Sequence, residues 1–230
     1  MHNGIQPLVE QIQQALLPNL YLESQNPNNP VVIYRIPSPW QCLGAGNYAA
    51  VFIHPDYPEQ VVKVYAPGRP GIFDEREVYR RIGEHPAFSR CYYGGTDFLV
   101  LKRLHGMTLY DCLHRGIIIP PQVIQDIDEA LDYARSRELF PHDVHGRNVM
   151  MSEGRGLVVD ISDFLHQAPC LAWQDLKWAY RWIYSPIFLH LKLPVPYFML
   201  DGVRAGYRLF RRLWPRRNQK QSLPHFSHFR

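Results

Sequence analysis

The chain has 230 residues, of which 46% are hydrophobic and 20% charged, so it can form one medium domain, or a small two-lobed one, with a hydrophobic core. Its formal net charge of +4 is too small to imply a groove for nucleic acid. The most apolar window, residues 182–200, is interrupted by prolines and charged residues, which argues against a continuous membrane-spanning helix.

The four cysteines are widely spaced, with no two within four residues of each other, which excludes a CxxC metal site. The first residues lack the basic and apolar regions of a secretory signal. Together these features predict reduced thiols in a cytoplasmic protein.

Residues 1–30 are predicted to be an N-terminal helical extension and a joint. Apolar residues at helical spacing predict a short amphipathic helix over residues 7–17 that packs on the main body. A stretch rich in proline and asparagine, residues 26–30, ends this helix. The β-branched and aromatic residues at 31–34 then predict a strand.

Two glycines one residue apart, Gly44 and Gly46, precede the apolar pair Val51 and Phe52. This pattern predicts a strand, a tight turn and a returning strand over residues 43–52. Glycine lets the backbone approach a phosphate closely because no Cβ is in the way, but such glycines also occur in ordinary hairpin turns. Both interpretations stay open on this motif alone.

Lys63 is the one lysine in an apolar strand predicted over residues 60–65. It either faces solvent or points inward, where its ammonium group can bind a phosphate. The helix predicted over residues 74–82 offers two carboxylates, Glu75 and Glu77, as partners for this lysine. Glu77 lies next to the apolar face, so we expect Glu77 to form the ion pair, with a solvated surface acid as the alternative.

The next elements are a strand over residues 98–104, a short helix over 108–113 with Thr108 as its N-cap, and a longer helix over 120–138. Strands therefore come first and helices afterwards. This order predicts an α+β fold with two lobes and a site between them.

The loop after the long helix places Asp143 and Asn148 five residues apart, and Asp160 ends the apolar run 157–159. Phosphoryl transfer needs a carboxylate that faces the acceptor hydroxyl and oxygen ligands that hold a metal ion on the phosphates. Mg²⁺ prefers hard oxygen ligands, so one amide oxygen and a second carboxylate suffice. The three side chains therefore predict a phosphoryl-transfer site.

Further helices are expected over residues 173–184 and 201–214, followed by a basic, flexible tail over 215–230. The last helix and the tail contain almost no acidic residues. Their cationic side chains are either solvated on a docked helix or make a weak contact with an anionic surface, such as membrane headgroups or nucleic acid. These residues are Arg204, Arg208, Arg211, Arg212, Arg216, Arg217 and Lys220.

Taken in order, the motifs resemble those of the eukaryotic-like protein kinase superfamily over residues 43–184. They are G-x-G-x-x-A-x-V, Val-Val-Lys, a helical glutamate, Asp-x-x-x-x-Asn and Val-Val-Asp. The resemblance implies a kinase-like domain over residues 31–214. Its N-terminal lobe (31–104) would be a small antiparallel β-sheet with one helix, and its C-terminal lobe (105–214) would be reduced and mostly α-helical.

The resemblance implies ATP and Mg²⁺ as cofactors and gives roles to the matching residues. Those of the lid over the phosphates would be Leu43, Gly44, Ala45, Gly46 and Val51. Those at the adenine would be the gatekeeper Leu101 and, in the hinge, Lys102 and Leu104.

The same resemblance implies that Lys63 contacts the α- and β-phosphates and that Glu77 holds it in place. Asp143 would orient and deprotonate the acceptor hydroxyl. Asn148 and Asp160 would be the protein ligands of magnesium.

Three departures from the family pattern shape the expected function. Pro-His replaces the usual His-Arg before Asp143, so control by a phosphorylated activation loop is not expected. Ile-Ser follows Asp160 in place of Phe-Gly, and Asp163 is a rival metal ligand, although a strand end fixes Asp160 better. The segment 161–174 is short, and no Ala-Pro-Glu follows it.

We therefore expect an ATP-dependent phosphotransferase similar to a minimal bacterial-type serine/threonine protein kinase, with an unidentified protein or small-molecule acceptor. One alternative is a small-molecule kinase similar to the aminoglycoside or sugar-amine phosphotransferases. Another is a nucleotide-binding pseudokinase that serves as a scaffold. The short segment after Asp160 favours the pseudokinase, and the presence of Lys63, Asp143 and Asn148 opposes it.

Overall fold

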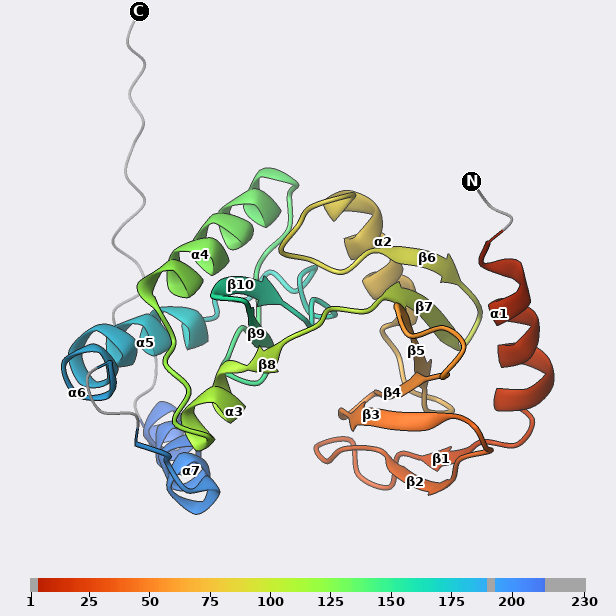
Figure 1. Cartoon of the computed structure of the whole chain (residues 1–230), viewed down its shortest axis with the longest axis horizontal. Helices are drawn as coiled ribbons and strands as arrows, with labels where there is room; N and C mark the ends of the chain where they lie inside the picture. Colours follow the sequence, from red (N-terminus) through yellow and green to blue (C-terminus); the bar gives the residue numbers. More distant parts are fainter. Residues whose placement is uncertain (1–3, 190–192, 214–230) are drawn as a thin grey trace, which may run out of the picture.

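The computed structural model describes residues 4–189 and 193–213 and shows two lobes (Figure 1). One lobe holds a five-stranded antiparallel sheet in the order β3-β4-β5-β7-β6, and the other is mostly helical. The predicted α+β fold, with strands first and helices afterwards, is confirmed. The predicted tail over 215–230, with Arg216, Arg217 and Lys220, lies outside the described residues.

The five strands of the large sheet follow the expected pattern, with one addition. The glycine pair lies at the β3–β4 hairpin, and the strand predicted around Lys63 has the expected bounds. The addition is β6, a short strand that pairs with β7 at the edge of the sheet. The strands are β3 (Gln41–Ala45), β4 (Ala49–Ile53), β5 (Gln60–Tyr65), β6 (Cys91–Gly94) and β7 (Phe98–Lys102).

The outer face of the sheet is covered by the N-terminal segment. Helix α1 (Gln6–Gln11) continues into the π-helical turn η1 (Ile12–Leu16). Their buried apolar side chains share one core cluster with alternate residues of β4, β5 and β7. The predicted amphipathic helix is thus confirmed. A two-stranded sheet of β1 (Tyr21–Glu23) and β2 (Val32–Arg35) follows.

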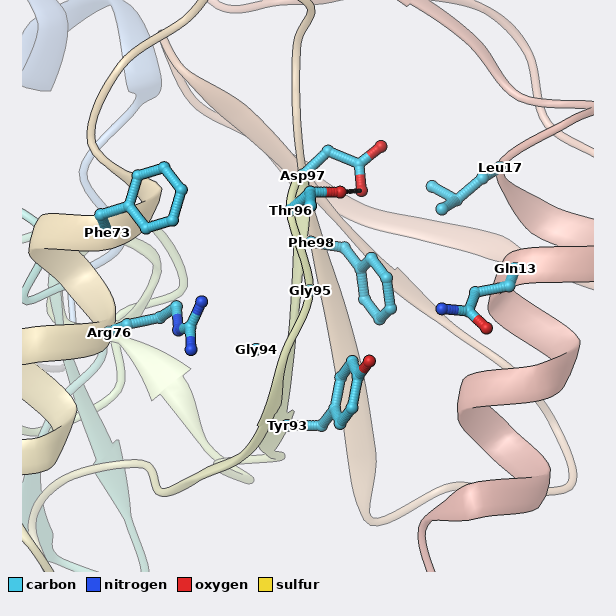
Figure 2. A pocket seen from close by; sticks show the side chains of 10 residues that line it. All are labelled: Gln13, Leu17, Phe73, Arg76, Tyr93, Gly94, Gly95, Thr96, Asp97 and Phe98. Carbon is cyan, nitrogen blue, oxygen red and sulfur yellow. Dashed lines mark hydrogen bonds between the residues drawn. The ribbon is translucent and has the colours of Figure 1, made fainter.

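The inner face of the sheet packs against α2 (Ile72–Ile82). On the outer side of this helix lies a hollow of about 440 Å³ between α2, the β6–β7 turn and the N-terminal helix. Figure 2 shows the Arg76 side chain reaching from α2 towards Gly94 at one wall of this hollow. The inner side of α2 faces the region between the lobes.

The C-terminal lobe is built on α4, which buries Val123, Ile127, Leu131 and Ala134 of its apolar stripe and leaves Ile124 half-buried. Thr108 caps α3, because its hydroxyl accepts a hydrogen bond from the backbone N–H of Asp111. The strands form a second sheet in the order β10-β9-β8. The elements are β8 (Met107–Thr108), α3 (Leu109–His114), α4 (Pro121–Ser136), β9 (Val149–Ser152), β10 (Arg155–Val158), α5 (Ala172–Ala179), η2 (Tyr180–Tyr184), α6 (Ser185–Phe188) and α7 (Tyr197–Leu213).

Both lobes contribute to one large core cluster, which runs from the inner face of the sheet through α2 to α4. The end of α2 is fixed to α4 because the Tyr133 hydroxyl donates to the Ile82 carbonyl at 2.6 Å. Among the described residues, no helix has the length and apolar character needed to cross a membrane.

Candidate active site

A buried ion pair joins the sheet to α2. The Lys63 ammonium lies 2.8 Å from the Glu75 carboxylate, and the two side chains are only 13% and 1% exposed. The Tyr65 hydroxyl also donates a hydrogen bond to Glu75. Lys63 therefore points inward, away from the outer face of the sheet, as the second of its two interpretations required.

The prediction that Glu77 forms the ion pair with Lys63 was wrong. The Glu77 carboxylate instead pairs with Arg80 at 2.6 Å and with Arg81 at 2.7 Å. The reason is the phase of the helix: α2 buries Ile72 and Glu75 together with the later apolar positions, and Glu77 falls on another side. Apolar residues lie three and seven positions after Glu75, a spacing that places Glu75 on the buried face of the helix and could have been used to predict it.

Asp160 meets Lys63 from the other lobe. Its Oδ1 lies 3.4 Å from the Lys63 ammonium and accepts a hydrogen bond from the Ser162 N–H at 3.2 Å. Burial opposes the charge of this aspartate, but Lys63 and the Ser162 hydrogen bonds outweigh burial, and the Asp160 pKa lies below its ordinary value. A cation of one lobe and an anion of the other thus face each other in their ionised forms.

The pKa values of the neighbouring groups fit the same arrangement. Burial lowers the pKa of Lys63, but the charges of Asp160 and Glu75 outweigh it and the pKa lies above its ordinary value. Burial raises the pKa of Asp163, and the charges of Asp160 and Asp143 raise it further. Of the two rival aspartates, Asp160 makes the ion pair with Lys63.

The loop between α4 and β9 presents Asp143 and Asn148. Asp143 is exposed and has a positive φ of 53°, which aspartate tolerates better than most residues. The Asn148 side-chain nitrogen donates to the Asp143 carbonyl at 3.0 Å. Since its amide nitrogen is engaged in this way, its amide oxygen is the atom available to a cation.

Asn148 and Asp160 are held near each other by the backbone. The Val159 N–H donates to the Asn148 carbonyl at 3.0 Å, beyond the end of the β9–β10 hairpin. This bond places Asn148 beside the residue that precedes Asp160. No group of three His, Cys, Asp or Glu side chains suited to a metal occurs in the described part of the chain. One carboxylate and one amide oxygen fit Mg²⁺, which keeps several water ligands.

The glycine hairpin lies beside Lys63. In the register of the sheet, Val51 is opposite Gly44 on one side and opposite Lys63 on the other. Leu43, Gly44, Ala45 and Gly46 are all exposed. A Cβ at Gly44 would meet nothing within 4 Å. The folded chain itself therefore imposes no steric need for glycine at this position.

The expected gatekeeper, Leu101, is buried opposite Val61 of β5, and the expected hinge follows it. The backbone of Lys102 is already used within the protein: its N–H donates to the Arg90 carbonyl at 2.8 Å, and its carbonyl accepts from the Ser89 hydroxyl at 2.7 Å. The Leu104 N–H has no hydrogen-bond acceptor among the residues that the structure describes.

Two polar contacts that support the site were not predicted. Asp126 is buried on α4, where it accepts from the Arg155 guanidinium at 2.7 Å and from the Gly156 N–H at 2.9 Å. Arg147, next to Asn148, pairs with Asp201 of α7 at 3.0 Å. Asp126 lies within the apolar stripe of α4, and this position indicates a buried acid. No local sequence pattern predicts the Arg147–Asp201 pair.

Comparisons with known proteins found one curated relative and several solved domains similar to this chain. The chain is 31% identical over 186 residues, 78% of its length and 85% of the relative, to "Putative serine/threonine-protein kinase YrzF" of Bacillus subtilis (strain 168). No protein-family model matches.

Among solved structures, the kinase domain of Mycobacterium tuberculosis PknI is 22% identical with a TM-score of 0.40, and the match covers 53% of this chain and 56% of that one. A mutant of that domain gives 21% identity, a TM-score of 0.41 and coverage of 68% and 65%. The chain thus spans less than two thirds of these solved domains. Because it covers 85% of a relative with which it is 31% identical, the chain belongs to the protein kinase superfamily.

Proposed function

We propose that the chain is an ATP- and Mg²⁺-dependent phosphotransferase that acts on hydroxyl groups in the manner of a serine/threonine protein kinase. The observation that carries this proposal is the Lys63–Glu75 ion pair with Asp160 beside it, since it joins a buried cation from one lobe to an anion from the other. Positioning and charge neutralisation are what phosphoryl transfer demands of a protein.

The nucleotide would lie between the glycine hairpin and Asp160. Lys63 would bind the α- and β-phosphates, because Glu75 holds its ammonium in place and the pKa keeps it charged. The unstrained, exposed Gly44 would leave room for phosphate oxygens next to the backbone. At the hinge, the Leu104 N–H would donate to the adenine ring, and Leu101 would form the wall behind it.

Asn148 and Asp160 would hold magnesium, whose charge would neutralise the β- and γ-phosphates. The amide oxygen of Asn148 and the carboxylate of Asp160 are hard donors that suit this ion. Asp143 would face the acceptor hydroxyl, orient it and take up its proton. The His145 ring lies 3.6 Å from the Asp143 carboxylate and helps to fix its direction.

The assignment of Asp143 is tested by Asp143→Asn. This variant should transfer phosphate from labelled ATP at least about a hundred-fold more slowly, because a general base contributes that much, and should bind nucleotide as wild type does. Lys63→Met should weaken nucleotide binding or transfer. Wild-type turnover in Asp143→Asn would reject the assignment of the base, and a silent Lys63→Met would reject the phosphate clamp.

The acceptor class is the open part of this proposal. The short segment between Asp160 and α5 leaves little chain for a peptide-docking platform, which favours a small hydroxyl compound as second candidate. Incubation of the protein with ATP and Mg²⁺, first with generic protein acceptors and then with a panel of aminoglycosides and sugar amines, separates the two by mass spectrometry. Nucleotide binding without transfer to any acceptor, and without ATP hydrolysis, would indicate a pseudokinase.

A further inference from the structure

Helix α7 is anchored to the catalytic lobe by one side of its first turns. The Tyr197 hydroxyl donates to Asp111 at 3.1 Å, and the Tyr197 ring stacks on the His114 ring with centroids 3.5 Å apart. Asp201, one turn later, accepts from the Tyr110 hydroxyl at 2.7 Å and pairs with Arg147. The face that carries Tyr197 and Asp201 is therefore directed towards α3 and the catalytic loop.

Three apolar residues between and just beyond these anchors face solvent. Phe198 is 76% exposed and Val203 is 73% exposed, and Met199 is exposed as well. Trp178 and Trp182 of α5 and η2 are also exposed, and these elements lie at the same end of the molecule as α7, away from the five-stranded sheet (Figure 1). Large apolar side chains that gather at one end of a protein mark a surface that another phase or partner covers.

The sequence that follows Asp201 has one sign of charge. No Asp or Glu follows Asp201, whereas the sequence of α7 continues with Arg204, Arg208, Arg211 and Arg212. A basic helix alone would suit a nucleic acid equally well, but phosphate contacts do not call for exposed Phe, Met and Val side chains. Basic and apolar residues together in one helix are typical of helices that lie in the interface of an anionic membrane.

We propose that α7 docks on the surface of an anionic phospholipid bilayer, with Phe198, Met199 and Val203 inserted among the headgroups and the basic sequence of the helix favouring anionic lipid. The tie between Asp201 and Arg147 then holds the catalytic loop close to that surface. Trp178 and Trp182 suit the same interface, because the indole ring prefers the headgroup level. This proposal does not depend on the phosphotransferase activity.

Co-sedimentation of the full chain with vesicles tests the proposal. It should bind vesicles of phosphatidylcholine that contain about 30% phosphatidylglycerol and should bind pure phosphatidylcholine at least about ten-fold more weakly. Raising the salt concentration from about 50 to about 500 mM should release it, because screening weakens the attraction. Brominated acyl chains should quench more of the tryptophan fluorescence in Phe198→Trp than in the wild type, whose own tryptophans set the baseline.

The apolar contribution is tested by the double variant Phe198→Ser, Val203→Ser, which leaves every charge in place. It should bind anionic vesicles at least about ten-fold more weakly, since two apolar side chains no longer leave water. Phe73→Ser is the matched control, because Phe73 is 68% exposed on α2 in the other lobe and should leave vesicle binding unchanged. Both variants replace exposed residues, and an unchanged melting temperature confirms that they fold.

Three results would overturn the proposal. The first is equal binding to neutral and anionic vesicles, or to neither. The second is binding to a nucleic acid duplex as tight as that to vesicles and indifferent to the double serine variant, which would make α7 a polyanion site. The third is a concentration-dependent dimer, seen by sedimentation, that the double serine variant dissociates while vesicles bind neither form.

Discussion

Glu75 and Glu77 are two positions apart in α2 and have opposite surroundings. Glu75 is buried against Lys63 and Tyr65, whereas Glu77 lies with two arginines at the surface. The burial of Glu75 raises its pKa although the Lys63 charge lowers it. Loss of the Glu75 carboxylate should therefore cost more free energy than loss of the Glu77 carboxylate, because it would leave the buried Lys63 cation without a compensating charge.

Glu75→Gln should weaken ATP-dependent turnover or nucleotide affinity by at least about ten-fold, since Lys63 loses the charge that holds it. Glu77→Gln, the matched control on the same helix, should change either quantity by less than about two-fold. Nucleotide titration and initial phosphotransfer rates measure both effects. A larger loss in Glu77→Gln than in Glu75→Gln would instead show that Glu77 is the residue that holds Lys63.

Asp126 makes a pH-dependent contribution to stability. Hydrogen bonds from Arg155 lower its pKa to about 2, against the effect of burial and with help from Gln122 and the Gly156 N–H. The folded pKa lies below the unfolded value of about 3.9, so this stabilisation is present above about pH 4 and is lost as pH falls towards 2. It corresponds to about 2 kcal/mol at neutral pH.

Asp126→Asn should therefore lower the free energy of unfolding by about 2 kcal/mol at pH 7, and the deficit should shrink as the pH falls from about 4 towards 2. Asp132→Asn is the control on the same helix, because Asp132 is exposed and pairs with the exposed Arg135 about one turn later; it should cost less than about 0.5 kcal/mol. Urea titrations at pH 7 and near pH 3 measure both. A deficit that grows on acidification would contradict the assignment.

Single residues were predictable from sequence where they broke a local pattern. Lys63 interrupts an apolar strand, and Asp143, Asn148 and Asp160 stand in polar positions next to apolar runs. Their contacts were less predictable. The pairing of Lys63 with Glu75 depended on the phase of α2, which begins two residues before the predicted start.

At the scale of elements, the β9–β10 hairpin depends on a close approach to α4. A Cβ at Gly156 would lie 2.4 Å from the Val123 carbonyl oxygen, which belongs to the helix backbone and cannot turn aside. The hairpin carries Asn148 before its first strand and Asp160 after its second. The distance between hairpin and helix therefore affects the geometry of the expected metal ligands.

Gly156→Ala should lower the free energy of unfolding by about 2–3 kcal/mol and should impair phosphotransfer, because the hairpin has to move away from α4. Gly94→Ala is the control: its Cβ would lie 2.5 Å from the Arg76 Nε, but that side chain is the flexible arm seen in Figure 2 and can swing away. It should cost less than about 1 kcal/mol. Thermal unfolding of the two variants makes the comparison, and equal losses would refute the distinction between backbone and side-chain neighbours.

Long elements with clear periodicity, such as α4 and β5, were predictable to within a residue or two. The elements without a sequence signal, β1, β6, β8, β9 and α6, have only two to four residues each. Such short strands form because a distant partner pairs with them. Met107 of β8, for example, pairs with Met151 of β9, and no local pattern encodes that partner.

At the scale of the whole molecule, the site is the place where two distant parts of the chain meet. Lys63 and Asp160 are 97 residues apart in sequence and 3.4 Å apart in space. The order of motifs predicted two lobes with a site between them, but their relative placement depends on contacts such as the Val158 N–H to the Ala87 carbonyl. Such contacts depend on how the two lobes pack together, and the local propensities of the sequence do not predict them.

This arrangement predicts that nucleotide and magnesium stabilise the fold together, since the ligand would contact both lobes. At about a hundred times its dissociation constant, a ligand adds about 2.7 kcal/mol, which for a chain of this size is about 5–10 °C in melting temperature. Thermal scans with ATP alone and with ATP and Mg²⁺ separate the contribution of the metal. Wild type should show a further rise when Mg²⁺ is added.

Asp160→Asn should abolish the Mg²⁺-dependent part of this rise, because the ligand loses the negative charge that holds the ion. Asp163→Asn is the matched control from the rival position and should keep it, since Asp160 is the aspartate that reaches Lys63. The reverse outcome would move the metal to Asp163. Loss of the rise in both variants would mean that the two carboxylates share the ion, and an unaltered rise in both would mean that neither carboxylate holds it.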